Sequence, residues 1–237
     1  MTSDAVQSGG TDAPAAQRQL GAQLLTAEYG ALAGALSAVW MASLTRTSLF
    51  LGVLSAVGVA LGFVAQAGGG VGATFTLFAL VTLPLALLLG LATFVRLIEV
   101  QREAIVYIAG MNRIRHFFAE SAPMIRPYLV LSTHDDEAGI YRSQGTGIRL
   151  RAPRYRLVFA LVQTQGIVGV VCAVLAACTG GIAAATVSVA VGWVVGAIAF
   201  VVIVVALFGY WNRSISEIEA ALRPLNPSPE TTEPPTI

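Results

Sequence analysis

Charged residues are scarce in this sequence, and lysine is missing from it. Asp, Glu, Lys and Arg make up 11% of the 237 residues, against about 25% in an average soluble domain, and all 14 basic residues are arginine. The net charge of +1 gives no global field that would attract nucleic acid. The two cysteines, Cys172 and Cys178, lie in one apolar run and are separated by about 9 Å of helix, which is too far for a disulfide.

Apolar surface takes the place of charge. Hydrophobic residues make up 56% of the chain, more than a soluble core needs, so we expect part of the surface to face lipid. Residues 47–95 and 157–212 form stretches of 49 and 56 residues without a formal charge. Each stretch is too long for one span of about 20 residues and long enough for two spans with a tight turn between them. The sequence therefore predicts an all-α integral membrane protein with four transmembrane helices in two hairpins.

Glycines indicate where the two hairpins turn. Gly68, Gly69, Gly70 and Gly72 interrupt the first stretch, and Gly180 and Gly181 interrupt the second. These turns place the spans at 48–66, 73–95, 157–178 and 186–209.

The rest of the chain divides around these spans. We expect residues 1–17 to be a disordered tail, 18–120 to form a helix, the first hairpin and a returning helix, and 121–156 to form a basic loop. That loop is predicted to be irregular or to contain a short β-hairpin, because Ile148 to Arg151 alternate in polarity and Gly145 and Gly147 favour a turn. Residues 157–212 then form the second hairpin, and 213–237 end a helix and continue as a proline-rich disordered tail.

The arginines predict the orientation in the membrane. Residues 96–156 carry ten of them, whereas the two glycine turns carry none. The positive-inside rule places this stretch, and with it both termini, in the cytoplasm. Abundant Ala, Gly and Arg are typical of a GC-rich bacterial genome, so the sequence predicts a multi-pass protein of a bacterial inner membrane.

Two apolar stripes extend beyond the first hairpin. Their residues recur at steps of three and four, as on one face of a helix. The stripes are Ala22, Leu25, Tyr29, Leu32, Leu36, Val39 and Ser43 before the first span, and Leu97, Val100, Ala104, Tyr107, Met111, Ile114 and Phe118 after the second. We expect them to pack as a cytoplasmic coiled-coil stalk; the alternative is two helices lying flat on the membrane.

Two polar groups in the basic loop are candidate contact sites. Arg149, Arg151, Arg154 and Arg156 precede the third span and are candidates for contact with anionic lipid or a partner, although setting the topology alone would explain them. The run His134, Asp135, Asp136 and Glu137 contains metal-ligand chemistry. Its members are consecutive, however, and metal sites gather ligands from separate positions, so we expect a solvated turn with Asx-type bonds rather than a metal site or a partner contact.

Inside the predicted spans, ionisable side chains are missing, which disfavours proton relays and ion-coupled transport. The polar side chains Gln163, Thr164 and Gln165 remain. They either hydrogen-bond between helices, which we favour, or line a pore in an oligomer.

Small residues at four-residue spacing predict close helix packing. Gly58 and Gly62 lie in the first span, and Ser188, Gly192 and Gly196 lie in the fourth. Such motifs serve either packing within one chain or formation of a homo-oligomer.

The sequence contains no P-loop, HExxH, GxSxG, CxxC or dinucleotide-binding motif, so we expect neither an enzyme nor a cofactor. The interpretation we favour is a non-catalytic scaffold or signalling component whose cytoplasmic part binds a partner protein or the inner leaflet. An oligomeric channel or membrane-permeabilising effector is the alternative, followed by a dimeric small-molecule exporter.

Overall fold

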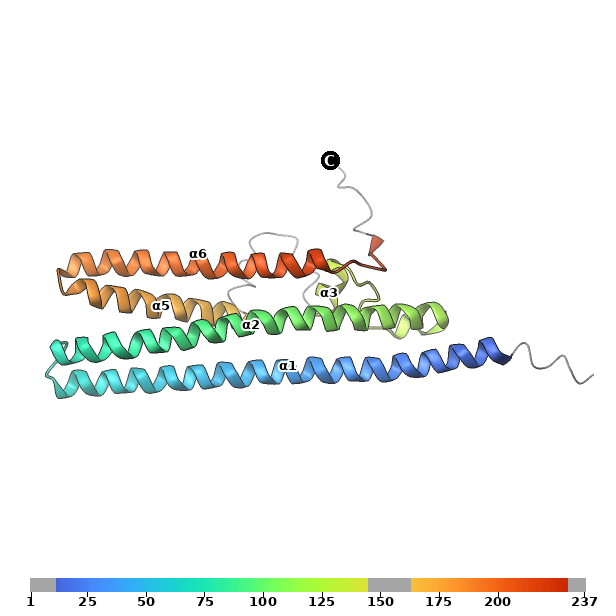
Figure 1. Cartoon of the computed structure of the whole chain (residues 1–237), viewed down its shortest axis with the longest axis horizontal. Helices are drawn as coiled ribbons and strands as arrows, with labels where there is room; N and C mark the ends of the chain where they lie inside the picture. The colour runs from blue at the N-terminus through green and yellow to red at the C-terminus, as the bar shows by residue number, and fades with distance from the viewer. Residues whose placement is uncertain (1–11, 145–162, 230–237) are drawn as a thin grey trace, which may run out of the picture. The chain divides into compact units, whose positions relative to one another are not determined.

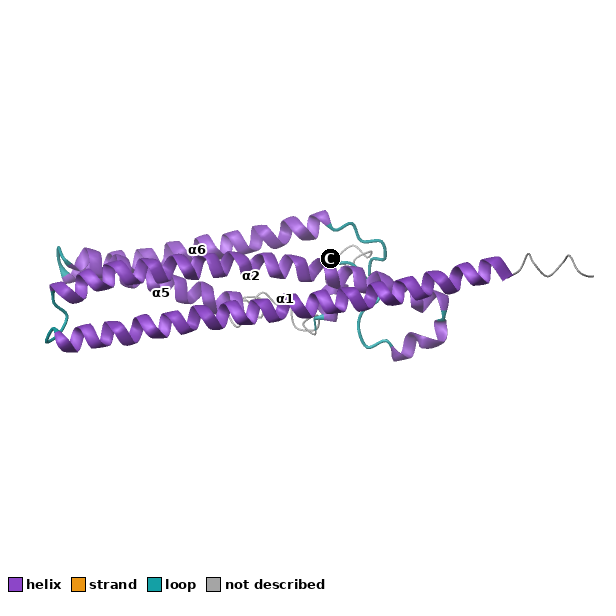
Figure 2. Cartoon of the chain, turned by 60° about the horizontal axis from the view of Figure 1, so that its bottom comes forward, coloured by secondary structure: helices purple, strands orange, loops and turns teal. Residues whose placement is uncertain are grey.

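The computed structural model of the chain describes residues 12–144 and 163–229. Within these ranges the secondary structure is helical and contains no strand (Figure 2). The elements are α1 (Asp12–Ala67), α2 (Ala73–Ser121), the 3-10 helix η1 (Pro123–Tyr128), α3 (Glu137–Ser143), α5 (Thr164–Ala185) and α6 (Val189–Ala221) (Figure 1).

Four of these helices, α1, α2, α5 and α6, are long and apolar enough to cross a membrane. The all-α, four-span prediction is confirmed at this level, and the helices are those of a multi-pass membrane protein. Both α1 and α2 extend well beyond their predicted spans, to 56 and 49 residues.

The turn of the first hairpin lies where the glycines predict it. Gly69 and Gly70 adopt φ angles of 70° and 131°, which are unfavourable for residues with a side chain. The Gly68 and Gly70 amides donate to the Val64 and Ala65 carbonyls at 3.1 and 2.8 Å. These bonds satisfy carbonyls that the end of α1 leaves open.

The glycine turn predicted for the second hairpin is wrong. Gly180 and Gly181 lie inside α5, which continues to Ala185, and α6 begins only at Val189. A Cβ on Gly181 would come within 3.3 Å of the Gly192 carbonyl oxygen of α6. Here the glycines allow two helix backbones to approach closely, and this use in packing replaces their use in a turn.

The chain divides into two compact units. Unit 1 contains Met1–Ala38, Ala104–Ile148 and Leu222–Ile237, and unit 2 contains Val39–Glu103 and Arg149–Ala221. Unit 1 therefore collects parts of the N-terminal, middle and C-terminal regions of the chain, whereas unit 2 contains the most apolar helical segments.

The core of unit 1 is the second half of α2. Its buried apolar side chains are Ala104, Ile105, Ile108, Ala109, Met111, Ile114 and Ala119. The helix α1 runs antiparallel to it, because Tyr29 bonds to Arg115 and Leu32 lies against Gly110. The predicted stripes are the covered faces here: Ala104, Met111 and Ile114 of the second stripe are buried, and those of the first that lie in unit 1 are half-buried.

Unit 2 packs its helices through small residues. A Cβ on Gly90 of α2 would collide with Phe50 of α1 at 2.9 Å and with Cys172 of α5 at 2.7 Å. The neighbouring pair α5 and α6 forms the second hairpin (Figure 1). Because only a glycine leaves room at this point of α2, Phe50 and Cys172 are both completely buried.

The two predicted tails need correction where the structure describes them. The helix α1 begins at Asp12, six residues before the expected start. Residues 224–229, expected to be disordered, carry hydrogen bonds to the middle of the chain. Residues 1–11 and 230–237, and the strand expected near 148–151, lie outside the described residues.

Candidate functional site

The most elaborate polar site of unit 1 is built around the acidic run that follows η1. Asp136 is the N-cap of α3, and its Oδ1 accepts the Gly139 amide at 2.9 Å. This is the Asx-type bond expected from the sequence, and it favours helix formation at this residue. A Cβ on Gly139 would lie 2.1 Å from the His134 carbonyl oxygen, so the acidic run folds back on α3 more closely than any side chain would allow.

Asp135 is the centre of the site, and its side chain has no solvent exposure. The carboxylate accepts Arg113 Nε at 2.6 Å, the Leu225 amide at 2.9 Å and the Asn226 amide at 2.7 Å. Burial alone would raise the pKa of this carboxyl, but the two backbone amides and the guanidinium outweigh it and hold the pKa below its ordinary value of 3.8. Asp135 is therefore a buried, charged anchor for the segment 222–229, named here the C-terminal segment.

Asp136 binds the C-terminal segment at Ser228, two residues after Asn226. Its Oδ2 accepts both the Ser228 amide, at 2.9 Å, and the Ser228 hydroxyl, at 2.5 Å. Ser228 is completely buried. Two adjacent carboxylates thus bind three backbone amides and one hydroxyl of the C-terminal segment.

A second polar layer supports the two aspartates from α2. Asn112 donates from Nδ2 to the His134 carbonyl at 2.7 Å, and its Oδ1 accepts Arg115 at 2.5 Å and Ser143 at 2.9 Å. Arg115 in turn donates to the Tyr29 hydroxyl at 2.7 Å, above whose ring its guanidinium lies. Every buried side-chain nitrogen and oxygen of the described residues has a partner, so this site is a complete network.

The sequence interpretation of the acidic run is corrected in one respect. The run was expected to be a solvated turn, but Asp135 and Asp136 are buried because Arg113 and the C-terminal segment cover them. Among the described residues no group of three metal-ligand side chains is placed to hold an ion. Sequence reasoning missed Arg113 and the C-terminal segment because the contacts use backbone amides, which no side-chain pattern reveals.

The predicted intramembrane polar residues lie at the start of α5. Gln165 Nε2 donates to Gln101 Oε1 of α2 at 2.7 Å and to Gln163 Oε1 at 3.0 Å. The indole of Trp211 in α6 donates to the same Gln101 oxygen at 3.0 Å. Thr164 is the first residue of α5. Gln101 therefore joins three helices of unit 2 by hydrogen bonds.

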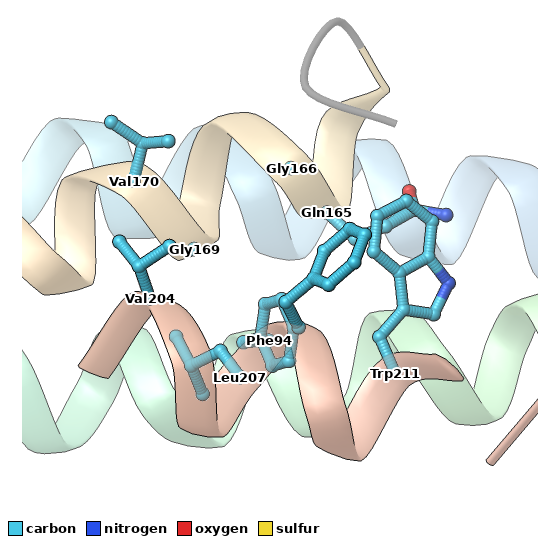
Figure 3. A pocket seen from close by; sticks show the side chains of 9 residues that line it. Phe94, Gln165, Gly166, Gly169, Val170, Val204, Leu207 and Trp211 are labelled. Atoms are coloured by element: carbon cyan, nitrogen blue, oxygen red, sulfur yellow. The ribbon is translucent and has the colours of Figure 1, made fainter. Parts of the chain in front are cut away.

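A small apolar crevice lies next to this cluster (Figure 3). Phe94 of α2 lies between α5 and α6, near Leu207, while Gln165 and Trp211 lie together at one end. The cavity volume is about 40 Å³, against the 300–1,000 Å³ typical of ligand pockets. The crevice is a packing feature of the hairpin rather than a small-molecule site.

The small-residue motifs differ in what they contact. A Cβ on Gly192 would lie 2.8 Å from the Gly181 carbonyl oxygen, and one on Gly196 would lie 3.0 Å from the Ala177 carbonyl oxygen. Both glycines therefore pack α6 on α5 within the chain. Gly58 and Gly62 of α1 have open space around them. Ser188 precedes α6 and its Oγ accepts the Val191 amide at 3.2 Å.

The four arginines proposed to contact lipid or a partner, Arg149, Arg151, Arg154 and Arg156, lie outside the described residues. No family model, curated protein or solved structure matches the chain. Its function therefore has to be argued from the geometry of its own residues.

Proposed function

We propose that the chain is a non-catalytic membrane scaffold that anchors a folded helical module, unit 1, at the cytoplasmic face of a bacterial inner membrane and offers it to a partner protein. The two apolar hairpins serve as the anchor. The module is formed by the N-terminal part of α1, the C-terminal part of α2, η1, α3 and the C-terminal segment.

The observation that carries this proposal is an exposed apolar segment in unit 1. It consists of Met124 and Tyr128 of η1 and Val130, which lies two residues beyond the end of η1, with exposed fractions of 80%, 81% and 94%. Apolar side chains exposed together outside a membrane span mark contact surfaces. Arg126 of η1 donates to the Ala119 carbonyl at 3.2 Å and pairs with Glu120 of α2, so the exposed segment is attached to the end of α2.

The position of this segment along the chain favours a protein over lipid as the partner. The helix α2 continues for 25 residues beyond Arg96, the first charge after the second predicted span, which is about 38 Å of helix. The inner-leaflet contact that the sequence also suggested is proposed instead for Arg149, Arg151, Arg154 and Arg156, next to the third predicted span.

The polar residues of the spans support an anchor more than a channel. Gln165 is committed to Gln101 and Gln163 within the chain, and Trp211 shares the Gln101 acceptor. Side chains that line an aqueous pore would instead bind water. A channel, and the less favoured dimeric exporter, remain proposals without such an observation behind them.

Purification of the full chain from native membranes tests the proposal. We expect a stoichiometric partner protein that is lost with the combined changes Met124→Ser, Tyr128→Ser and Val130→Ser. The matched control is Val71→Ser with Val187→Ser, which changes equally exposed apolar residues at the hairpin turns and should retain the partner.

Liposome flux decides between this proposal and the channel. Purified protein in vesicles should cause no ion leakage. Leakage that disappears with Gln163→Leu and Gln165→Leu would favour a pore and overturn the scaffold.

A further inference from the structure

Residues 223–228 of the C-terminal segment lie on the two aspartates and bend at Leu225 and Asn226, whose consecutive amides both point at Asp135. The hydrogen bonds involve the Arg223 carbonyl, which accepts Arg113 at 2.9 Å, the amides of Leu225 and Asn226, and the amide and hydroxyl of Ser228. The Asn226 carbonyl also accepts the Asp135 amide at 3.4 Å. Four of the six residues from 223 to 228 are thus contacted.

The two prolines of this segment lie at positions where the aspartates bind no backbone amide. Pro224 precedes the two amides that bind Asp135, and Pro227 precedes the amide that binds Asp136. Proline has no amide hydrogen and fixes its own φ angle, which lowers the entropy cost of binding. The site therefore selects a peptide in which two residues with free amides follow one proline, and a serine follows the next.

Little apolar surface holds the segment in place. The Leu225 side chain is 70% exposed, and Arg223, Pro224 and Pro227 are also exposed. Regions with few buried apolar contacts open at low free-energy cost. The segment is held by polar bonds that a second peptide of the same chemistry would reproduce.

We propose that Asp135 and Asp136, positioned by Arg113, form a docking site for a proline-flanked, serine-containing segment of a partner protein, and that the chain's own residues 223–228 occupy this site in cis. The occupant in trans is a Pro-x-x-Pro-Ser peptide that bends between its two prolines. Because the tethered segment has a high effective concentration, the partner binds well only when this segment is released. The inference rests on the proposed scaffold function for its partner, but the site is defined by the contacts above.

The test uses the full chain in nanodiscs and a fluorescent peptide with the sequence Arg-Pro-Leu-Asn-Pro-Ser-Pro. The chain's own segment is weakened by Leu225→Pro with Ser228→Ala, which removes one amide and the hydroxyl bound by the aspartates. We expect this double variant, called the vacated chain below, to bind the peptide at least tenfold more tightly than the wild type. Adding Asp136→Asn should abolish the gain, and a peptide with alanine in place of serine should bind the vacated chain at least tenfold more weakly.

Equal binding by the vacated and wild-type chains, or equal binding of the serine and alanine peptides, would overturn the proposal. Hydrogen exchange in the wild-type chain gives a second readout that needs no variant. Excess serine peptide should speed exchange of the Leu225 and Asn226 amides, and an unchanged rate at saturation would also overturn the proposal. Loss of the partner with the Met124, Tyr128 and Val130 changes is a separate result, so failure of either proposal is distinguishable from failure of the other.

Discussion

At the scale of single residues, the chain places its few charges where they organise backbone. Asp135 is completely buried, yet its charge is matched by Arg113 and by two amides of the C-terminal segment. Arg113 is partly exposed, so water screens this pair, but loss of Arg113 would leave the buried carboxylate with only the two amides as partners. The effect of Asp135 on stability therefore depends on its remaining ionised.

The pH dependence of the C-terminal segment follows from this. Because the pKa of Asp135 is held below 3.8 in the folded chain, its contribution to stability is fully present above pH 3.8 and is lost as pH falls through the lowered pKa. We expect a spin label on Leu225→Cys, in a chain with both native cysteines replaced by alanine, to stay immobile from pH 7 to pH 4. It should become mobile only in stronger acid.

The variant Asp135→Asn supplies the control for this titration. It removes the charge but keeps the size of the side chain, so the label should be mobile already at pH 7. A label that loosens at the same pH in both chains would show that another group controls the segment.

At the scale of helices, the apolar pattern predicts the elements well and their ends less well. The stripes of α1 and α2 identify the covered faces, since side chains three and four residues apart share one side of a helix. Gly180 and Gly181 were misread because glycine serves both turns and close packing, and only the facing Gly192 decides between them. The C-terminal segment was missed because backbone amides hold it while the Leu225 side chain remains exposed.

The packing of α5 on α6 leads to a prediction for Gly192→Ala. The new methyl would lie 2.8 Å from the Gly181 carbonyl oxygen and 2.9 Å from Ala185 Cβ. Overpacking of this kind costs about 1–3 kcal/mol, which corresponds to a Tm lower by about 2–12 °C for a chain of this size. Thermal unfolding in detergent, followed by circular dichroism, measures the change.

Gly58→Ala is the matched control, because it makes the same change at a helical glycine with open space around it. Alanine favours helix more than glycine does, so its Tm should be equal or higher. Similar losses for the two variants would contradict the proposed packing role of Gly192.

At the scale of the whole chain, a series of hydrogen bonds restricts the topology. Tyr29 bonds to Arg115, Asn112 bonds to the His134 carbonyl, and Asp135 bonds to the Asn226 amide. Groups joined in this way share one aqueous compartment, so we expect the N-terminal, middle and C-terminal parts of unit 1 to lie on the same side of the membrane. Two predicted spans separate the N-terminal part from the middle part, and two separate the middle part from the C-terminal part. Four crossings therefore agree with this expectation.

Labelling with a membrane-impermeant maleimide tests both this shared side and its orientation. In a chain without native cysteines, Met124→Cys and Leu225→Cys replace exposed side chains of unit 1, and Val71→Cys and Val187→Cys replace exposed side chains at the hairpin turns. Because the arginine bias predicts that unit 1 is inside, we expect only the two turn cysteines to react in intact spheroplasts, and all four to react after permeabilisation. Reaction of Met124→Cys and Leu225→Cys together would reverse the orientation but keep the shared side, whereas reaction of only one of them would contradict the docking of the C-terminal segment itself.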